Sequence, residues 1–497
     1  MREVNRRQFL AYMGIGAAVG LVQSCGGGQG PIGMMMGGGG GGGTTTPGDP
    51  FQDPPLAQLT RNGNIVETSL SPMRAQATIN GQSVTMMLYN GSYPAPTIRV
   101  RSGDILRVNF TNDLPANADI TGTNVIGYDM SVTNLHTHGW HVSPSGNADN
   151  IFLHFNPGDS LTFEYDLSKQ WGGMMGFYHP HNHGTVGEQF WRGLAGGALI
   201  VEDDTSELQN YEEHIMIITD ISVSNGLPTE WTRMDYMRIL GDTVMVNGQV
   251  NPVLNIQPGQ VQRWRILNAC VYRYLRVSLQ NHTMYLVGTD DNLLDSPVQV
   301  NEILITPGER VDILVKADQT PGTYTFEDLN SNTPLVTVEY SGAQTNDSIP
   351  TTITSDIANW VAQLRQMDTS NLRQVTMTLN FVRGQGAINR QVFGQNTYIL
   401  ESPVGTYEVW TIVNQTGMDH PFHQHVDGAV ILNINGGDPA YAQLYSTING
   451  LKDTINVPPM GSVTMLVPVL DYTGDTVFHC HILGHEDIGM MGIWRRV

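Results

Sequence analysis

Residues 103–112 read Gly-Asp-Ile-Leu-Arg-Val-Asn-Phe-Thr-Asn, a strand-like run that begins at a glycine and ends at an asparagine. The same nine-residue offset between glycine and asparagine returns at 259–268 and at 405–414. A second glycine follows each copy at a similar distance, at Gly158, Gly308 and Gly461. Self-similarity at regular intervals is typical of a repeated structural unit. The chain is therefore expected to hold three copies of one β-rich unit.

Length and composition agree with this expectation. A chain of 497 residues is long enough for about three domains. Its 55 glycines and 26 prolines suit many short strands joined by turns. We predict an all-β fold of three Greek-key β-barrels, with a short helix at 355–366 leading into the third.

The histidines carry the chemistry. Ten of the fifteen fall into four short clusters, namely His136-Thr137-His138, His179-Pro180-His181, His420-Pro421-Phe422-His423-Gln424-His425, and His479-Cys480-His481 with His485. Met490 stands ten residues after the cysteine. A thiolate flanked by imidazoles, with a thioether nearby, is the ligand set that copper selects.

Strand geometry divides these ligands into two sets. Thr476-Val477-Phe478 suggests an extended segment, and alternate side chains of a strand point to opposite faces. Cys480 then faces a mononuclear site of the blue-copper electron-transfer pattern, which we assign to His420, Cys480, His485 and Met490. The opposite face receives eight imidazoles in four His-x-His pairs, His136, His138, His179, His181, His423, His425, His479 and His481. Eight imidazoles suit a cluster of three copper ions.

The pairing has a physical reason. Two histidines at i and i+2 lie side by side, close enough to hold adjacent ions but too splayed to serve one ion easily. The bonded path from Cys480 to His479 and His481 then offers electrons a short route between the two sites.

The four motifs together resemble the three-domain multicopper oxidases of the laccase and cuprous-oxidase type, from about residue 60 to the C-terminus. The resemblance implies cupredoxin-like barrels and four copper ions, one of type 1, one of type 2 and two of type 3. It places His136 and His423 at the type 2 ion. It divides the type 3 ligands into two trios, His138 with His179 and His481, and His181 with His425 and His479.

A single His-x-His pair would carry little weight, because isolated pairs are common on surfaces and in cores. Four pairs in the family's order, one of them around a cysteine, reverse that judgement. The five remaining histidines are interpreted as packing or surface residues: His141, His154, His183, His214 and His282. Among them His183 lies nearest the cluster motifs and is the expected exception.

The three copies are not chemically equal. Where the first copy has Gly-Phe-Tyr-His at 176–179 and the third ends at His479, the middle copy has Gly-Thr-Tyr-Thr-Phe-Glu at 322–327. The middle copy therefore lacks ligands there, and the trinuclear site is expected between the first and third copies, a common placement for reactive sites. The predicted boundaries are an export signal at 1–25, a Gly-rich linker at 26–55, and domains at 56–205, 206–345 and 346–497.

The N-terminus resembles an export signal. Arg6 and Arg7 precede a short apolar stretch from Phe9 to Val22, and the arginine pair resembles the twin-arginine type. Val22-Gln23-Ser24-Cys25 resembles a bacterial lipoprotein cleavage site. We expect a protein of the periplasm or cell envelope, with Cys25 as a candidate lipid anchor, and a monomer.

Three cysteines leave little room for a disulfide framework, and Cys270 is expected to be a buried apolar residue. A formal net charge of −21 argues against nucleic acid and favours cationic or neutral reductants.

The expected reaction couples four one-electron oxidations of a reductant to the reduction of dioxygen to two waters. Protons must also arrive, and Glu486, Asp487 and Asp149 are candidate general acids. A phenol or aromatic amine is favoured as donor because the stretch 349–390 holds only Met367 and Met377, whereas cuprous oxidases of this family often carry a methionine-rich insertion there.

Two alternatives stay open. Met234, Met237, Met245, Met490 and Met491 leave a cuprous or other metal-ion oxidase in copper tolerance. A non-catalytic copper-binding envelope protein is the alternative of another class, but it would leave the eight further imidazoles without a role.

Overall fold

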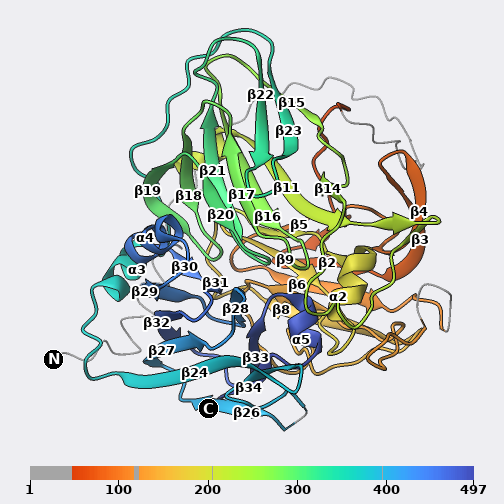
Figure 1. Ribbon diagram of the computed structural model, residues 1–497. Helices are drawn as coiled ribbons and strands as arrows, with labels where there is room; N and C mark the ends of the chain where they lie inside the picture. The colour runs from red at the N-terminus through yellow and green to blue at the C-terminus, as the bar shows by residue number, and fades with distance from the viewer. Residues whose placement is uncertain (1–47, 117–121, 204, 395) are drawn as a thin grey trace. The chain divides into compact units, whose positions relative to one another are not determined.

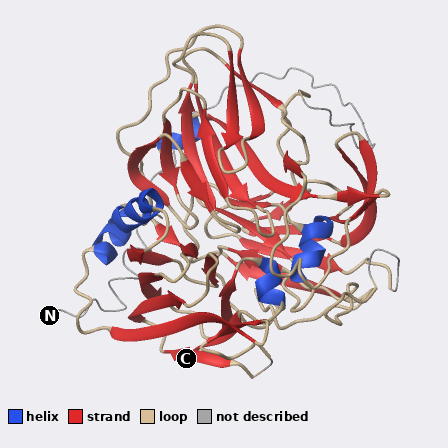
Figure 2. Ribbon diagram, in the orientation of Figure 1, coloured by secondary structure: helices blue, strands red, loops and turns tan. Residues whose placement is uncertain are grey.

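The computed structural model describes residues 48–116, 122–203, 205–394 and 396–497. The predicted export signal, Cys25 and most of the linker lie outside these residues. Strands dominate the described chain, as Figure 2 shows, and this confirms the all-β prediction. No helix within the described ranges combines the length and apolar character that a membrane span needs.

The first unit comprises two four-stranded sheets and a hairpin. In spatial order the first sheet is β1 (Thr60–Asn62), β2 (Ile65–Leu70), β6 (Ile105–Thr111) and β8 (Ser160–Asp166). The second is β5 (Ile98–Val100), β10 (Ala198–Val201), β9 (Met175–His179) and β7 (His136–His138). The hairpin is β3 (Pro72–Ile79) and β4 (Gln82–Tyr89). Asn80 and Gly81 both have positive φ at its turn, the conformation that Asn-Gly favours in tight hairpins.

The middle unit has larger sheets. The six-stranded sheet is β14 (Thr243–Val246), β11 (Glu212–Ile221), β16 (Val261–Asn268), β21 (Arg310–Lys316), β18 (Met284–Gly288) and β19 (Leu293–Val300). The five-stranded sheet is β15 (Val253–Ile256), β23 (Thr333–Tyr340), β22 (Thr323–Asp328), β17 (Leu275–Leu279) and β20 (Ile303–Ile305). A small hairpin joins β12 (Val223–Ser224) to β13 (Leu227–Pro228).

The third unit repeats this plan. Its six-stranded sheet is β25 (Gln385–Ile388), β24 (Arg373–Val382), β27 (Thr406–Asn414), β32 (Ser462–Val469), β29 (Ala429–Asn435) and β30 (Leu451–Lys452). Its five-stranded sheet is β26 (Tyr398–Ser402), β34 (Met491–Arg496), β33 (Gly474–Cys480), β28 (His420–Gln424) and β31 (Thr454–Val457).

Helical segments are short. They are α2 (Val186–Gln189), the π-helical turn η1 (Phe190–Leu194), the 3₁₀ turn η2 (Glu207–Asn210), α3 (Ala358–Arg365), α4 (Pro439–Thr447) and α5 (Leu483–Asp487). Helix α3 confirms the helix expected at 355–366. Helix α5 had no counterpart in the sequence analysis.

The repeated sequence segments are equivalent strands, which Figure 1 labels β6, β16 and β27. Each pairs in parallel with the first long strand of its unit, β2, β11 or β24. Each also pairs antiparallel with the strand after the second glycine, β8, β21 or β32. The prediction of three copies of one unit is therefore confirmed.

The two ends of the repeat have structural reasons. Its leading residues, Gly103, Gly259 and Gly405, have φ of 86°, 82° and 76°, a region that favours glycine. The closing asparagine is buried in every copy. The Asn112 side chain donates to the carbonyls of Ser131 and Phe155 and accepts from the Leu114 amide. Asn268 and Asn414 make the same pattern of contacts, so this residue ties the strand end to the neighbouring loops.

Candidate metal centre

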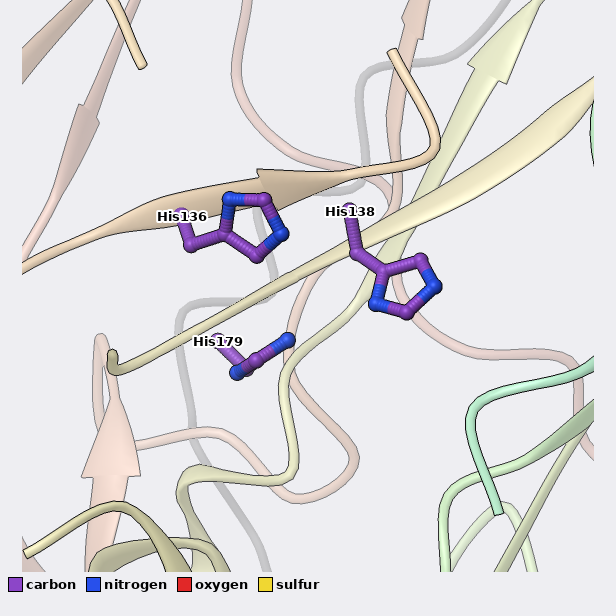
Figure 3. Close-up of side chains that lie close together, drawn as sticks. All are labelled: His136, His138 and His179. Carbon is purple, nitrogen blue, oxygen red and sulfur yellow. The ribbon is translucent and has the colours of Figure 1, made fainter. Parts of the chain in front are cut away.

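Strand pairing brings the four histidine motifs together. In the first unit β7 pairs with β9, so that His136 lies opposite His179. In the third unit β28 pairs with β33, so that His423 lies opposite His479. Figure 3 shows the rings of His136, His138 and His179 gathered in one place. The register of two strand pairs thus assembles residues up to 345 positions apart, from His136 to His481.

Strand β33 separates two sites, as the alternation of its side chains predicts. The Cys480 sulfur lies 3.3 Å from His420 Nδ1 and 3.6 Å from His485 Nδ1. On the opposite face, His479 Nε2 lies 3.1 Å from His181 Nε2 and 3.3 Å from His425 Nε2. Nitrogen atoms of neutral imidazoles at such distances need a shared cation or proton between their lone pairs.

On the sulfur side, the Nε2 atoms of two imidazoles contact oxygen atoms of other residues. His420 Nε2 contacts the Thr416 hydroxyl at 2.8 Å, and His485 Nε2 donates to the Met237 carbonyl at 3.1 Å. A neutral imidazole with its Nε2–H so engaged presents the Nδ1 lone pair. Both Nδ1 atoms face the Cys480 sulfur and lie 3.2 Å from each other. These three atoms converge on one point, as a metal site requires.

The backbone of Met490 is hydrogen-bonded to two of these three residues. Its amide donates to the His485 carbonyl at 2.9 Å, and its carbonyl accepts from the Cys480 amide at 3.0 Å. Met490 and Cys480 are both fully buried in one apolar cluster. Burial raises the pKa of the Cys480 thiol, so a thiolate here depends on a bound cation.

The other face holds the eight imidazoles. Rings of the same His-x-His pair lie with centroids 4.9 to 5.9 Å apart. Rings from different units stack, His136 on His425 at 3.9 Å and His138 on His423 at 3.7 Å. The side-by-side pairs predicted from strand spacing are therefore present, and the first and third units interleave at the cluster.

Several of these imidazoles have one nitrogen engaged and one free. His136 Nδ1 lies 3.0 Å from both oxygens of Asp149, His179 Nδ1 lies 2.9 Å from the Pro180 carbonyl, and His423 Nδ1 lies 3.0 Å from the Asp453 carbonyl. Their Nε2 atoms are buried and have no hydrogen-bond partner among the described residues. Such orphaned lone pairs, oriented by an acceptor behind the ring, are the arrangement of metal-binding histidines.

Protonation favours the same role. Burial lowers the pKa of several cluster histidines, and that of His423 falls to about 4. The same direction and cause hold for His138, His179, His181, His425 and His481. On the sulfur side burial lowers the pKa of His485 to about 4. Neutral imidazoles are the form that binds metal.

The geometric groups overlap the expected trios without matching all of them. His181, His425 and His479 form one compact trio. His138 and His179 group with His136 rather than with His481, whose ring lies 4.9 Å from that of His138 and 5.7 Å from that of His179. All eight imidazoles nevertheless belong to one continuous cluster.

The three candidate acids are buried in different surroundings. Asp149 accepts from the Thr137 amide at 2.8 Å and holds His136. Glu486 lies 3.1 Å from His479 Nδ1 and 3.4 Å from His181 Nδ1. These two carboxylates therefore touch the imidazole cluster directly.

Asp487 has a different environment. It accepts hydrogen bonds from the amides of Gly184, Val186 and Gly187 at 2.7 to 3.1 Å. Burial raises the pKa of its carboxyl, and the three amides oppose that shift. Asp487 thus fastens α5 of the third unit to the start of α2 in the first.

Asp453 is a cluster residue that the sequence analysis missed. One of its carboxylate oxygens lies 3.2 Å from His138 Nε2 and 3.5 Å from His423 Nδ1. Thr454 also contacts both rings at 3.2 Å. Nothing in the local sequence marks Asp453, because its role depends on the pairing of β31 with β28 and on contact with the first unit.

None of the five leftover histidines belongs to a candidate metal-binding group in the described part of the chain. His141 pairs with Asp427 and Asp471. His154 contacts Asn182, His214 contacts Asp53, and His282 contacts Tyr340. His183, the expected exception, packs edge-on against Tyr128 and Phe393.

The donor set fits copper on the sulfur side, where one thiol and two imidazole Nδ1 atoms meet near a thioether-bearing residue. On the other face, imidazole is the ligand that suits copper, zinc, iron and nickel alike.

Comparison with known proteins agrees with this geometry. Models of multicopper oxidase domains match residues 73–206, 211–343 and 361–496. These matches together span most of the chain, which belongs to the multicopper oxidase family. Membership implies copper binding and oxidase chemistry with oxygen as the acceptor.

Relatives and a solved structure are similar along most of their length. The multicopper oxidase mco of Staphylococcus haemolyticus is 28% identical over 81% of this chain and 82% of its own. A laccase of Haloferax volcanii is 27% identical over 82% of this chain and 77% of its own. The fold is similar to that of a multicopper oxidase from Campylobacter jejuni, with a TM-score of 0.76, 24% identity, and coverage of 91% of this chain and 96% of that one.

Proposed function

We propose that this protein oxidises a phenol or aromatic amine by single electrons at the Cys480 side of β33 and reduces dioxygen to water at the imidazole side. The observation that carries the proposal is the division of one strand between two donor sets, a sulfur with two imidazoles and a cluster of eight imidazoles. Four copper ions bound there, one beside Cys480 and three in the cluster, would supply the one-electron and oxygen chemistry.

The chain's own residues connect the two sites. Cys480 is bonded through its backbone to His479 and His481, so the electron path between the sites runs through covalent bonds. Cys480 of β33 is paired with Phe422 of the neighbouring strand β28. This pairing holds the backbone of the proposed electron path in place. The link is rigid because every residue in it is fully or almost fully buried.

We assign the delivery of protons to two acids. Glu486 faces His479 and His181, and Asp149 faces His136, so each lies where a proton could be passed into the cluster. Asp487, also a candidate from the sequence, binds three amides and is assigned the role of a fastening residue instead.

The donor is proposed to approach the surface over His485. Its Nε2 is covered by the Met237 carbonyl of the middle unit, at the end of a turn in which the Met237 amide donates to the Met234 carbonyl at 3.0 Å. Arg238 lies over the ring of Tyr272 at the same place. An aromatic donor resting on this surface would be separated from the imidazole by one hydrogen-bonded carbonyl.

A cuprous-ion donor is the second candidate. Met245, Met490 and Met491 are buried and so are not available to a donor at the surface. Met234, by contrast, is 73% exposed, and its thioether could bind a soft cuprous ion beside the turn over His485.

Steady-state kinetics with a methoxyphenol and with cuprous ion separate the two donors. If cuprous ion is the donor, Met234→Leu lowers kcat/KM for that ion about tenfold, because a soft ligand is lost, and leaves the phenol rate unchanged. Met73→Leu, at a half-buried methionine of β3 in the first unit, is the matched control. A wild-type protein that turns over neither donor contradicts the proposed reaction.

Oxygen uptake tests the alternative of another class. A non-catalytic copper-binding envelope protein would bind copper beside Cys480 without consuming oxygen in the presence of either donor. Uptake by the copper-loaded protein that ceases on chelation supports the oxidase.

Export to the periplasm or cell envelope, lipid attachment at Cys25 and a monomeric state complete the proposal. Residues Arg6 and Arg7 and the apolar stretch from Phe9 to Val22 support export. Cell fractionation of the wild type and of Cys25→Ala tests attachment, since a lipid anchor predicts that only the variant is released from the membrane fraction.

A further inference from the structure

The middle unit reaches the imidazole cluster although its sequence lacks the metal ligands of the other two units. Its residue Gly308 lies in the turn that precedes β21. A Cβ atom on Gly308 would lie 2.8 Å from the His481 ring, so this turn packs directly against the cluster. Arg310, the first residue of β21, continues from it into the buried interior.

Arg310 holds one carboxylate in a fixed position. Its Nη1 and Nη2 donate to the two oxygens of Asp453 at 2.7 and 2.6 Å, a bidentate pair. Its Nε donates to the Met175 carbonyl of β9 at 2.9 Å. Both charged side chains are buried, Arg310 at 1% exposure. A single guanidinium therefore joins the middle unit to the first and the third at the cluster.

Asp453 in turn determines how two rings are presented. The carboxylate oxygen 2.7 Å from Arg310 is the same one that lies 3.2 Å from His138 Nε2. His138 Nδ1 is buried without a hydrogen-bond partner among the described residues. A carboxylate at Nε2 favours the proton there and leaves the Nδ1 lone pair for a metal. His136, His179 and His423 show the opposite arrangement, with Nε2 free.

We propose that Arg310 is a positioning residue of the imidazole cluster: it holds Asp453 where that carboxylate fixes the ring orientation and tautomer of His138 and supports His423. This rests on the proposed role of these two histidines as copper ligands. The planar fork matters beyond its charge, because both carboxylate oxygens are held and neither can turn away from the rings.

The surrounding charges explain why this position needs a cation. Lys452 pairs with Asp290 at 2.9 Å and Glu309 at 2.7 Å, so it is already engaged. Arg310 lies 3.5 Å from Asp291 in addition to its pair with Asp453. Removing the guanidinium would leave buried carboxylates without compensation, which is strongly destabilising. Arg310→Met is therefore a poor test, and Arg310→Lys, which keeps the charge, is the informative variant.

The experiment compares Arg310→Lys with Arg263→Lys in the full-length protein. Arg263 lies on β16, the register partner of β21, is 3% exposed, and pairs with Asp312 and Glu213 rather than with cluster residues. Four quantities are measured for both variants. They are the copper bound per chain, the spin-resonance signal of the non-blue (type 2) copper, the absorption band of the Cys480 site, and the melting temperature of the copper-free protein.

Arg310→Lys is expected to weaken copper binding in the cluster about 10- to 100-fold, the usual effect of losing an outer partner of a metal ligand. Its non-blue signal changes and its Cys480 band stays. Arg263→Lys lowers the melting temperature similarly and alters neither signal. Asp453→Asn reproduces the Arg310→Lys spectrum, and the double variant adds little to either single change.

Two outcomes overturn different claims. If Arg310→Lys binds copper with wild-type affinity and an unchanged non-blue signal, the positioning role is wrong. If the wild-type protein itself binds no copper in the cluster, the proposed function fails instead.

Discussion

The two faces of β33 differ in the chemical groups that contact the imidazole nitrogen atoms turned away from each proposed metal site. On the sulfur side, His420 is backed by the Thr416 hydroxyl and His485 by the Met237 carbonyl, both neutral groups. On the cluster side, carboxylates contact several of the rings: Asp149 contacts His136, Asp453 contacts His138, and Glu486 contacts His479 and His181. Backbone carbonyls hold His179 and His423.

This difference corresponds to the two proposed chemistries. A site that only passes electrons gains from a rigid, neutral surround, because its charge changes by one and no proton need follow. A site that reduces oxygen must take up protons and carries several cations, so anionic groups near its ligands stabilise it and can act as acids. Carboxylate contacts to imidazole are thus found on the face proposed to reduce oxygen and not at His420 or His485.

The sharpest way to break the comparison is Cys480→Ser. A hydroxyl is a poor ligand for copper in place of a thiolate, so the intense absorption band and turnover are expected to disappear while the cluster still binds copper. Absorption, spin resonance and metal analysis measure this. Cys270→Ser is the control, since Cys270 is an equally buried thiol of the middle unit. Persistence of the band in Cys480→Ser would remove Cys480 from the electron site.

The acids of the cluster side provide the next test. Glu486→Gln keeps the size of the side chain and removes its acid, so turnover should fall about 10²- to 10⁴-fold with little change in melting temperature. Asp487→Asn should instead lower stability by about 1 to 3 kcal/mol, because an NH2 donor replaces one of the two oxygens that accept from buried amides, and should affect turnover less. Kinetics and thermal unfolding of both variants decide; equal effects on turnover would contradict the separate roles.

Much of this arrangement follows from the sequence by local rules. The spacing from Gly103 to Asn112 recurs because the glycine needs positive φ and the buried asparagine ties the strand end to neighbouring loops. The opposite directions of Cys480 and His479 follow from strand alternation alone. The extended conformation of 476–480 and the helix near 358–365 were also predictable, since each depends on adjacent residues.

What could not be predicted lies between distant segments. Asp453, Arg310 and Met237 reach the sites only because three units pack together, and none belongs to a recognisable pattern. Asp487 was a candidate acid because it lies two residues after the expected ligand His485, yet in α5 its side chain accepts from three amides. Sequence spacing identified the residues that meet within a strand pair. The groups that contact those residues from other units are determined by tertiary packing.

His141 sharpens the comparison because it is a buried imidazole whose two nitrogen atoms both contact carboxylates. Asp427 lies 2.9 Å from its Nδ1 and Asp471 lies 3.2 Å from its Nε2. Burial alone would lower the pKa of His141, but these carboxylates raise it to about 9. His423 of the cluster is the opposite case, because burial lowers its pKa to about 4.

The raised pKa of His141 predicts a pH dependence of stability. Its contribution is fully present below the unfolded pKa of about 6.5 and is lost as the pH rises through about 9, a difference of about 3 kcal/mol. Melting temperatures from pH 6 to 10 should therefore fall in the wild type. They should fall less in His141→Gln, which cannot carry the charge. Identical profiles in the two proteins would show that His141 is not protonated in the folded state.

The smallest expected effect tests how the sulfur side is tuned. Met490 is proposed as a weak thioether ligand, so Met490→Leu is expected to raise the potential that a bound copper ion would have and Met490→Gln to lower it, since such a ligand is one control on that potential. Voltammetry measures the shift, and a change of about 59 mV corresponds to a factor of ten in the one-electron equilibrium. Met491→Leu is the matched control, because Met491 is equally buried but packs in a separate cluster with Ile151 and Val477. If Met490→Leu and Met490→Gln leave the potential where Met491→Leu leaves it, Met490 would not be a ligand, and the neutral groups that contact His420 and His485 would control the potential without it.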